Sequence, residues 1–127
     1  MKSYTVDTYE IELVEAWQAT YKQGQLTLWI FLALSDSPKS LIDIRQYLED
    51  ASNGTVSAND KSLYRSLRRY YAASMVNFAT IPSQRGGPPS KLYSLSPVGQ
   101  RVLTEFIHRN LPVLIHNQQI KEILKND

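Results

Sequence analysis

The chain has 127 residues, of which 43% are hydrophobic, enough for one domain with a core and too few for two. It contains no cysteine, which excludes disulfides, thiol nucleophiles and cysteine metal sites and fits a reducing compartment. The first ten residues lack the basic and apolar regions of a signal peptide, and the longest apolar run, residues 28–34, is far shorter than the roughly 20 residues of a membrane-spanning helix. We therefore expect a single soluble, cytoplasmic domain with appendages.

The net charge of +2 is unevenly distributed along the chain. Residues 57–110 carry eight basic and two acidic side chains, a net charge of +6, whereas the other residues carry six basic and ten acidic ones, a net charge of −4. Such polarity is typical of a module that meets nucleic acid or an acidic surface.

The first third of the chain predicts two helices. Apolar residues recur at helical spacing between residues 8 and 22: Leu13, Val14, Trp17 and Tyr21. Asp7 is the expected N-cap of this helix and Gly24 its expected stop. Residues 26–36 are apolar on nearly all sides, and their neighbours favour a buried helix over a strand.

Two further helices are expected before residue 75. Ser37 and Pro38 predict the N-cap and first position of a helix that ends near Ser52, and its apolar positions are Leu41, Ile44, Leu48 and Ala51. Ser57 and Asp60 then have capping-box spacing, which predicts a helix over about 58–74.

The helix predicted over 58–74 is strongly two-faced. At 100° per residue, one stripe gathers four basic side chains, Lys61, Arg65, Arg68 and Arg69. Leu63, Leu67 and Tyr70 lie opposite. One face is expected to be buried and the other to meet either solvent or a negatively charged partner.

The last third predicts a β-hairpin and two helical segments. VNFATI (76–81) and KLYSL (91–95) read as short strands, separated by a tip whose two glycines and three prolines forbid regular structure. Ser96 and Pro97 start a helix that Pro112 interrupts after Asn110. Its inward-facing residues are expected to be Val98, Val102, Leu103, Phe106 and Ile107. Beyond this helix lies an apolar stripe at helical spacing: Val113, Leu114, Ile120, Ile123 and Leu124. We expect a partner chain to cover it.

A basic helix followed by a hairpin is the order of a winged helix. The runs SLYRSLRRY (62–70) and RGGPPSKLYSLSPVGQRVL (85–103), with MV between them, resemble the PadR family of bacterial transcriptional regulators. The resemblance covers roughly residues 26–110. The sequence departs from the family pattern at Tyr70-Tyr71 in place of Leu-Glu, at Ser96 in place of Thr, at Ser74 in place of a helix-ending glycine, and at 39–41 in place of His-Gly-Tyr.

The resemblance implies a mainly α fold with a small β-hairpin, a winged helix-turn-helix with extra terminal helices for dimerisation. Residues 1–25 would form an N-terminal helical extension, 26–110 the winged-helix DNA-binding domain and 111–127 a C-terminal dimerisation helix. It implies a homodimeric repressor, without a cofactor, that binds double-stranded promoter DNA in the nucleoid. Within the family, the whole chain resembles a clock-associated regulator of cyanobacteria, which implies a circadian clock gene as target.

The candidate DNA contacts lie on the basic helix and the wing, about residues 82–91. Arg65 could form a bidentate contact with guanine, while Lys61, Arg68 and Arg69 belong to the same basic stripe and the two arginines are better placed for phosphates. Arg85, flanked by glycine, could enter a minor groove or remain a surface arginine. Four residues have two open interpretations: capping or DNA contact for Asn59 and Ser62, core packing or phosphate contact for Tyr64, and phosphate contact or none for Lys91.

Two other functions are compatible with the sequence. The basic face could bind an acidic protein, making the chain a winged-helix interaction module, or a ligand pocket could make it an effector-responsive regulator. Trp17 and Trp29 could line such a pocket, although their apolar stripes favour core packing. No phosphate loop or paired catalytic residues are recognisable, and His108 and His116 have no cysteine near them, so neither an enzyme nor a metal site is expected.

Overall fold

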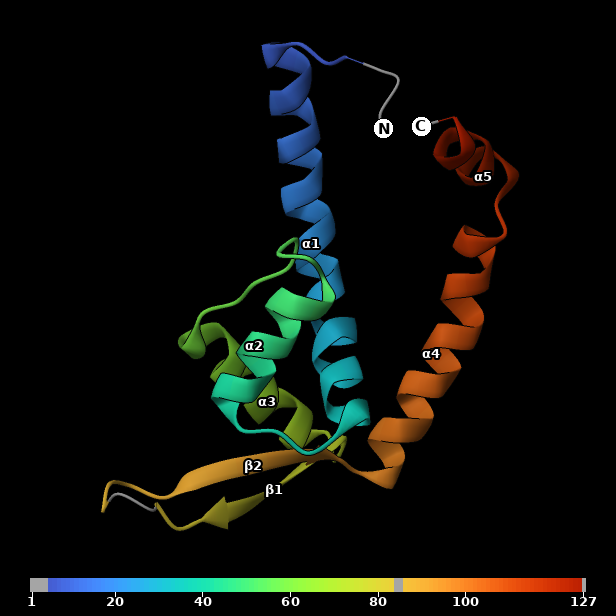
Figure 1. Ribbon diagram of the computed structural model, residues 1–127. Helices are drawn as coiled ribbons and strands as arrows, with labels where there is room; N and C mark the ends of the chain where they lie inside the picture. The colour runs from blue at the N-terminus through green and yellow to red at the C-terminus, as the bar shows by residue number, and fades with distance from the viewer. Residues whose placement is uncertain (1–4, 84–85, 127) are drawn as a thin grey trace.

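The computed structural model describes residues 5–83 and 86–126 and is mainly helical with one β-hairpin (Figure 1). Its elements in chain order are α1 (Thr8–Asp36), α2 (Leu41–Ala51), α3 (Asp60–Ala72), β1 (Val76–Ile81), β2 (Ser90–Leu95), α4 (Pro97–Ile115) and α5 (Gln118–Lys125). The predicted fold class, a winged helix-turn-helix with extra terminal helices, is confirmed.

α1 is one continuous helix, so the prediction that Gly24 ends a first helix is wrong. Its start is as expected: the Asp7 carboxylate accepts a hydrogen bond from the Glu10 amide at 2.8 Å, and the Glu10 side chain accepts one from the Asp7 amide at 3.0 Å. A glycine in a helix interior costs only about 1 kcal/mol relative to alanine, and burial of the following apolar turns outweighs that cost. α1 thus runs without a break across the expected boundary between residues 25 and 26.

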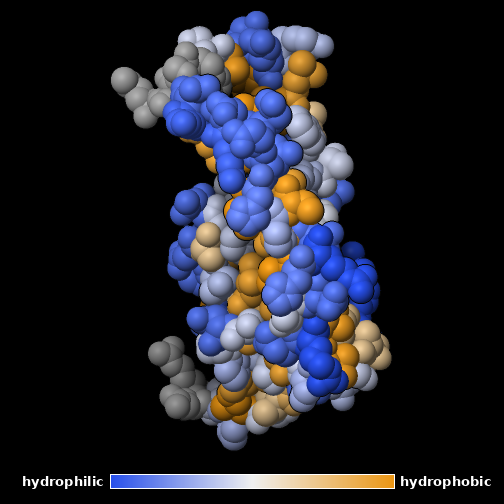
Figure 2. Space-filling model, turned by 90° about the vertical axis from the view of Figure 1, so that its right-hand side faces the viewer, coloured by the Kyte–Doolittle hydropathy of each residue, from blue (hydrophilic) through white to orange (hydrophobic). Residues whose placement is uncertain are grey.

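The core lies where α2, α3 and the hairpin pack around the C-terminal half of α1 (Figure 1). Its fully buried side chains come from all these elements and the α2–α3 loop: Ile30, Ile44, Leu48, Val56, Leu63, Leu67 and Val76. The N-terminal half of α1 projects beyond this core, and α4 and α5 rise on its other side (Figure 1). Figure 2, viewed from the α4 side, shows hydrophobic patches along the length of the molecule.

α4 differs from the prediction in two ways. It continues through Pro112 to Ile115, so the proline removes a backbone hydrogen bond of the helix without ending it. Of its five residues expected to face inward, Leu103 is buried, Ile107 packs against the core, and the other three, Val98, Val102 and Phe106, stay 40–47% exposed. α4 lies close to α1 near its start and then diverges from it (Figure 1). α1 therefore covers only part of the apolar face of α4.

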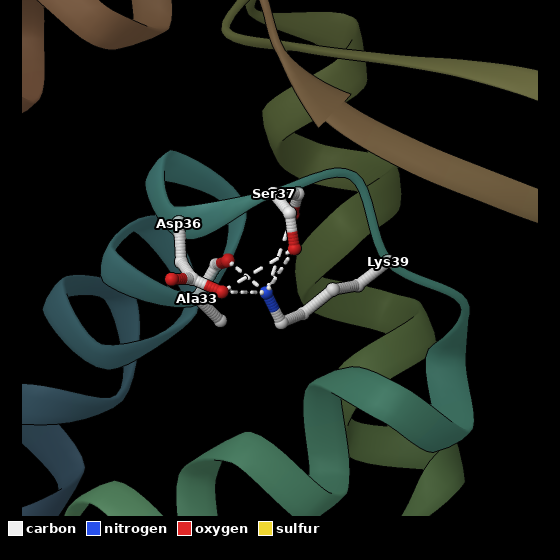
Figure 3. Close-up of polar contacts among 4 residues, drawn as sticks. All are labelled: Ala33, Asp36, Ser37 and Lys39. Atoms are coloured by element: carbon white, nitrogen blue, oxygen red, sulfur yellow. Dashed lines mark hydrogen bonds and ion pairs between the residues drawn. The ribbon is translucent and has the colours of Figure 1, made fainter.

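The corner between α1 and α2 is organised by Lys39, and the prediction that Ser37 caps α2 is wrong. The N-cap of α2 is Ser40, because Lys39 is held in extended conformation by backbone hydrogen bonds with Tyr93 of β2, at 2.9 and 2.8 Å. The buried Lys39 ammonium donates to the Ala33 carbonyl, the Asp36 carboxylate and the Ser37 hydroxyl, each at 2.8 Å (Figure 3). A lysine thereby closes the C-terminus of α1, where cations are favoured.

α3 begins and ends inside its predicted range. Its N-cap is Asn59, whose side chain accepts a hydrogen bond from the Ser62 amide at 2.8 Å, so neither the predicted cap Ser57 nor a start at Ala58 is correct. The helix ends at Ala72, and Ser74 follows with a φ of 63°. That left-handed conformation accounts for a glycine at this position in the family pattern, since glycine adopts it without strain.

The hairpin is antiparallel, with Val76 opposite Leu95 and Phe78 opposite Tyr93. Ser96 is the N-cap of α4 as predicted: its hydroxyl accepts from the Gly99 amide at 3.0 Å and donates to the Ser74 carbonyl at 2.6 Å. A β-carbon on Gly99 would lie 2.0 Å from the Met75 carbonyl oxygen. The Ser-Pro-x-Gly run therefore fixes the start of α4 against the end of α3.

Candidate nucleic-acid interface

The exposed face of α3 is basic, and its opposite face is buried as predicted. Leu63 and Leu67 are fully buried, whereas the four cations of the stripe are exposed: Lys61, Arg65, Arg68 and Arg69. α3 packs on α2 through its apolar side, which leaves the stripe facing away from the core. The helix is therefore positioned to present its cations to a partner.

The positive charge of this face is not neutralised within the described part of the chain. The sole carboxylate of α3, Asp60, forms an ion pair with Arg45 of α2. None of the described carboxylates lies within ion-pair distance of Lys61, Arg65 or Arg68. Exposed cations without counter-ions attract polyanions through a field that extends about one Debye length from the surface.

The two adjacent arginines of the stripe point in different directions. The Arg68 guanidinium lies 5.9 Å from the centre of the Tyr64 ring, on the side of the hairpin. The Arg69 guanidinium lies 5.9 Å from the Tyr70 ring and donates to the Ser66 hydroxyl at 3.4 Å. Arg68 thus joins the surface between α3 and the hairpin, whereas Arg69 belongs to the opposite edge of the helix.

Lys91 of β2 lies near the loop end of the hairpin, opposite Thr80, and its ammonium approaches a ring of α3. Its ammonium lies 4.6 Å from the centre of the Phe78 ring and 5.4 Å from that of the Tyr64 ring. Tyr64 itself is 42% exposed, so it is an edge residue and not part of the core. The structure therefore brings Tyr64, Arg68 and Lys91 together, three of the predicted site residues from two separate elements.

Sequence reasoning missed two aromatic residues at this surface, Tyr71 and Phe78. Their ring centres are 5.0 Å apart, and the Phe78 ring lies 6.1 Å from that of Tyr93. Strand alternation carried the missing signal, because it places Phe78 on the same face as the buried Val76, and Lys91 on the same face as Tyr93. Burial raises the pKa of the Tyr93 hydroxyl, and its interaction with Tyr64 adds a smaller upward shift.

Asn59 and Ser62 lie in the first turn of α3. Asn59 has the structural role of N-cap, and its exposed side chain is still within reach of a ligand at the helix start. Ser62 is half-buried and lines a groove beside Lys22 of α1. The candidate wing residue Arg85 lies outside the described residues.

The two tryptophans behave differently. Trp29 packs against the core as predicted, but Trp17 is 77% exposed on the projecting half of α1, so the prediction of core packing is wrong for it. Among the described residues there is no group of three or more histidine or acidic side chains that could hold a metal ion. No helix in the described ranges is long and apolar enough to cross a membrane.

Several solved structures with this architecture are PadR-like transcriptional regulators. A PadR-like transcription factor from Bacteroides fragilis is 25% identical, with a TM-score of 0.65 over 84% of this chain and 96% of that chain. A PadR-family regulator from Eggerthella lenta is 20% identical, with a TM-score of 0.69, and the match covers 95% of this chain and 100% of that chain.

A third similar structure is Bacillus subtilis PadR in complex with operator DNA. It is 22% identical, with a TM-score of 0.59, and the match covers 65% of this chain. The chain spans less than half, 46%, of the length of that protein. No protein-family model and no curated protein sequence matches the chain. The solved structures nevertheless agree on the architecture: the chain has the winged-helix fold of PadR-like transcriptional regulators.

Proposed function

We propose that the chain is a homodimeric winged-helix repressor that binds double-stranded promoter DNA. The observation that carries this proposal is the basic face of α3, whose cations are exposed and have no carboxylate partner among the described residues. The same fold occurs in Bacillus subtilis PadR, which was solved with operator DNA. Repression would follow from occupation of the promoter, without catalysis or a cofactor.

In the proposed complex, α3 enters a major groove. Arg65, in the second turn of α3, is placed to read a guanine edge, while Lys61 and Arg68 neutralise phosphates beside it. The wing extends toward the flanking backbone or minor groove, where Arg85 is the proposed contact. The proposed site is completed by five residues that border the same surface: Asn59, Ser62, Tyr64, Arg69 and Lys91.

The proposed partner of the terminal helices is a second copy of the chain. Exposed apolar side chains follow the N-terminal half of α1, α4 and α5: Val14, Trp17, Tyr21, Phe106, Val113, Leu114, Ile120, Ile123 and Leu124. We call this set the terminal apolar surface. An apolar surface of this extent is typical of an interface. A symmetric dimer would place two α3 helices on a roughly palindromic operator with half-sites about one or two helical turns apart.

We further propose the domain division 1–25, 26–110 and 111–127, with the middle part binding DNA and the terminal parts making the dimer. The sequence also resembles the cyanobacterial circadian period-extender protein Pex. That resemblance supports a Kai clock gene as the repressed target. We propose that the protein acts in the cytoplasm, associated with the nucleoid.

The proposal is tested by fluorescence anisotropy on a duplex from the gene's own upstream region or a clock-gene promoter, with excess random DNA. If a dimer neutralises about eight phosphates, log K falls with log salt at a slope near −7. Arg65→Gln and Arg85→Ala should lose competitor-resistant binding. Arg101→Gln on α4 also removes one positive charge, but outside the proposed site and the terminal apolar surface, and it should keep that binding.

Weak binding that random DNA displaces equally from the wild type and both arginine variants, on each promoter tried, would contradict the repressor. The basic face would then serve an acidic protein, which a pull-down with the wild type and Arg65→Gln would recover differentially.

A further inference from the structure

A groove with aromatic walls lies between α3 and the hairpin, on the same side as the basic face. It has a volume of about 370 Å³, and no carboxylate is among its lining residues. Tyr64, Arg68 and Tyr71 contribute from α3, and Phe78, Lys91 and Tyr93 from the hairpin. Two cations therefore border a hollow that is otherwise lined by four aromatic rings and by Leu67 and Ala72 of α3.

In this groove the Lys91 ammonium is held by contacts with aromatic rings and not by an ion pair. Lys91 pairs with Thr80 across the hairpin, so it is a diagonal neighbour of Phe78 on the same face of the sheet. Its ammonium lies over the Phe78 ring at 4.6 Å and the Tyr64 ring at 5.4 Å, distances at which the negative face of a ring attracts a cation. No described carboxylate forms an ion pair with it, so its charge is ordered and still available.

The groove lies where a DNA backbone strand would pass. If α3 occupies a major groove and the hairpin reaches the flanking minor groove, the sugar–phosphate strand that separates those grooves runs between the two elements. On the α3 side of this path lies the Arg68 guanidinium, 5.9 Å from the Tyr64 ring, and on the hairpin side lies Lys91. The rings between them offer apolar surface to the deoxyribose.

Resting on the repressor function above, we propose that the groove seats this backbone strand and that Phe78 is the positioning residue for the phosphate contact made by Lys91. Tyr71 supports the Phe78 ring from α3, with ring centres 5.0 Å apart. An ammonium that is already ordered loses less side-chain freedom when it meets a phosphate than a mobile lysine does. A backbone contact carries no sequence information, so its contribution appears on any duplex.

The test measures binding of a mixed-sequence duplex, longer than two helical turns, by anisotropy across a series of low salt concentrations. Lys91→Gln removes one phosphate contact per subunit, so the slope of log K against log salt becomes shallower by about 2 for a dimer. Phe78→Leu keeps the charge, so it should weaken binding about tenfold with little change in slope, and Phe78→Tyr should restore binding. Arg101→Gln on α4, at an exposed arginine outside both the groove and the terminal apolar surface, is the charge-matched control.

A double-mutant cycle separates positioning from a merely structural role. If Phe78 acts through Lys91, Phe78→Leu costs nothing further in the Lys91→Gln background. An undiminished further loss in that background, or full binding by Phe78→Leu alone, overturns the proposal. If the wild type binds no duplex even at low salt, the repressor function itself fails, and that result differs from one in which the wild type and both variants bind equally.

Discussion

Gly99 and Lys39 are single residues outside the candidate nucleic-acid interface that fix how the helices and the hairpin around it meet. Gly99 lets α4 start directly against the Met75 carbonyl, and Lys39 joins the end of α1 to β2, the strand that carries Lys91. Both lie at corners where two elements meet. Their substitution should therefore alter stability before it alters recognition.

Gly99→Ala should destabilise the fold. The added β-carbon would lie 2.0 Å from a backbone oxygen, which cannot rotate away as a side chain would. Overpacking of this kind costs about 2–3 kcal/mol, so thermal unfolding followed by circular dichroism should shift down by roughly 10 °C. Gly87→Ala is the matched control, since the one described atom that its β-carbon would meet is the Ser83 hydroxyl oxygen, at an ordinary 3.5 Å. Equal melting of the two variants would contradict the clash.

Asp36 should make stability sensitive to acid. Hydrogen bonding to Lys39, together with the attraction of its charge, lowers the pKa of the Asp36 carboxyl below its ordinary value of 3.8. A lowered pKa contributes stability that is fully present above the ordinary value and is lost as the pH falls through the lowered one. In thermal melts between pH 7 and strongly acidic pH, Asp36→Asn should start lower than the wild type and converge with it in acid. A constant difference at all pH values would show that the pair contributes nothing through ionisation.

At the scale of elements, patterns within one helix or strand predicted more than boundaries between elements did. The two faces of α3, the hairpin and the Ser96 cap followed from periodicity and local capping chemistry. The Gly24 stop and the Ser37 cap failed because tertiary contacts decide those positions: core burial carries α1 through Gly24, and backbone pairing with Tyr93 extends Lys39 past the expected start of α2.

The same distinction applies to the site. Helical spacing found the cations of α3, whereas the meeting of Lys91 with Tyr64 depends on how the hairpin folds back on the helix, which no local pattern specifies. The apolar residues of α4 show most clearly what helical periodicity cannot predict. Their spacing correctly indicated burial for Leu103, yet Val102 and Phe106 remain exposed, because periodicity does not say how far the rest of the chain covers an apolar face.

Asn59 allows capping to be separated from recognition within α3. Asn59→Ala should lose about 1 kcal/mol of stability, because the Ser62 amide loses its acceptor. Asn59→Asp keeps the cap, so its melting temperature should match that of the wild type, but it adds a negative charge beside the proposed phosphates and should weaken DNA binding about tenfold. Wild-type affinity of Asn59→Asp at low salt would place this residue away from the DNA.

At the scale of the whole molecule, the terminal apolar surface predicts the oligomeric state. Trp17→Glu places a charge at its most exposed large side chain, where burial against a second copy would be costly, and should convert the proposed dimer to a monomer in sedimentation velocity. Ile42→Glu, at an exposed isoleucine of α2 outside that surface, is the control and should remain dimeric. A Trp17→Glu variant with an unchanged sedimentation coefficient would exclude this surface from the dimer.

The continuity of α1 through Gly24 has a mechanical consequence. At 1.5 Å per residue, its 29 residues make a rod about 43 Å long that carries Trp17 near one end and core residues at the other. A hydrogen bond of 2.6 Å between Thr27 and the Tyr70 hydroxyl couples this rod to α3. In the proposed dimer, the stretch of α1 from Trp17 to Thr27 is about 15 Å long, so a tilt of about 5° at the dimer contact would move α3 by about 1 Å. The operator spacing that the proposed repressor accepts would then be set by the angle between two stiff arms.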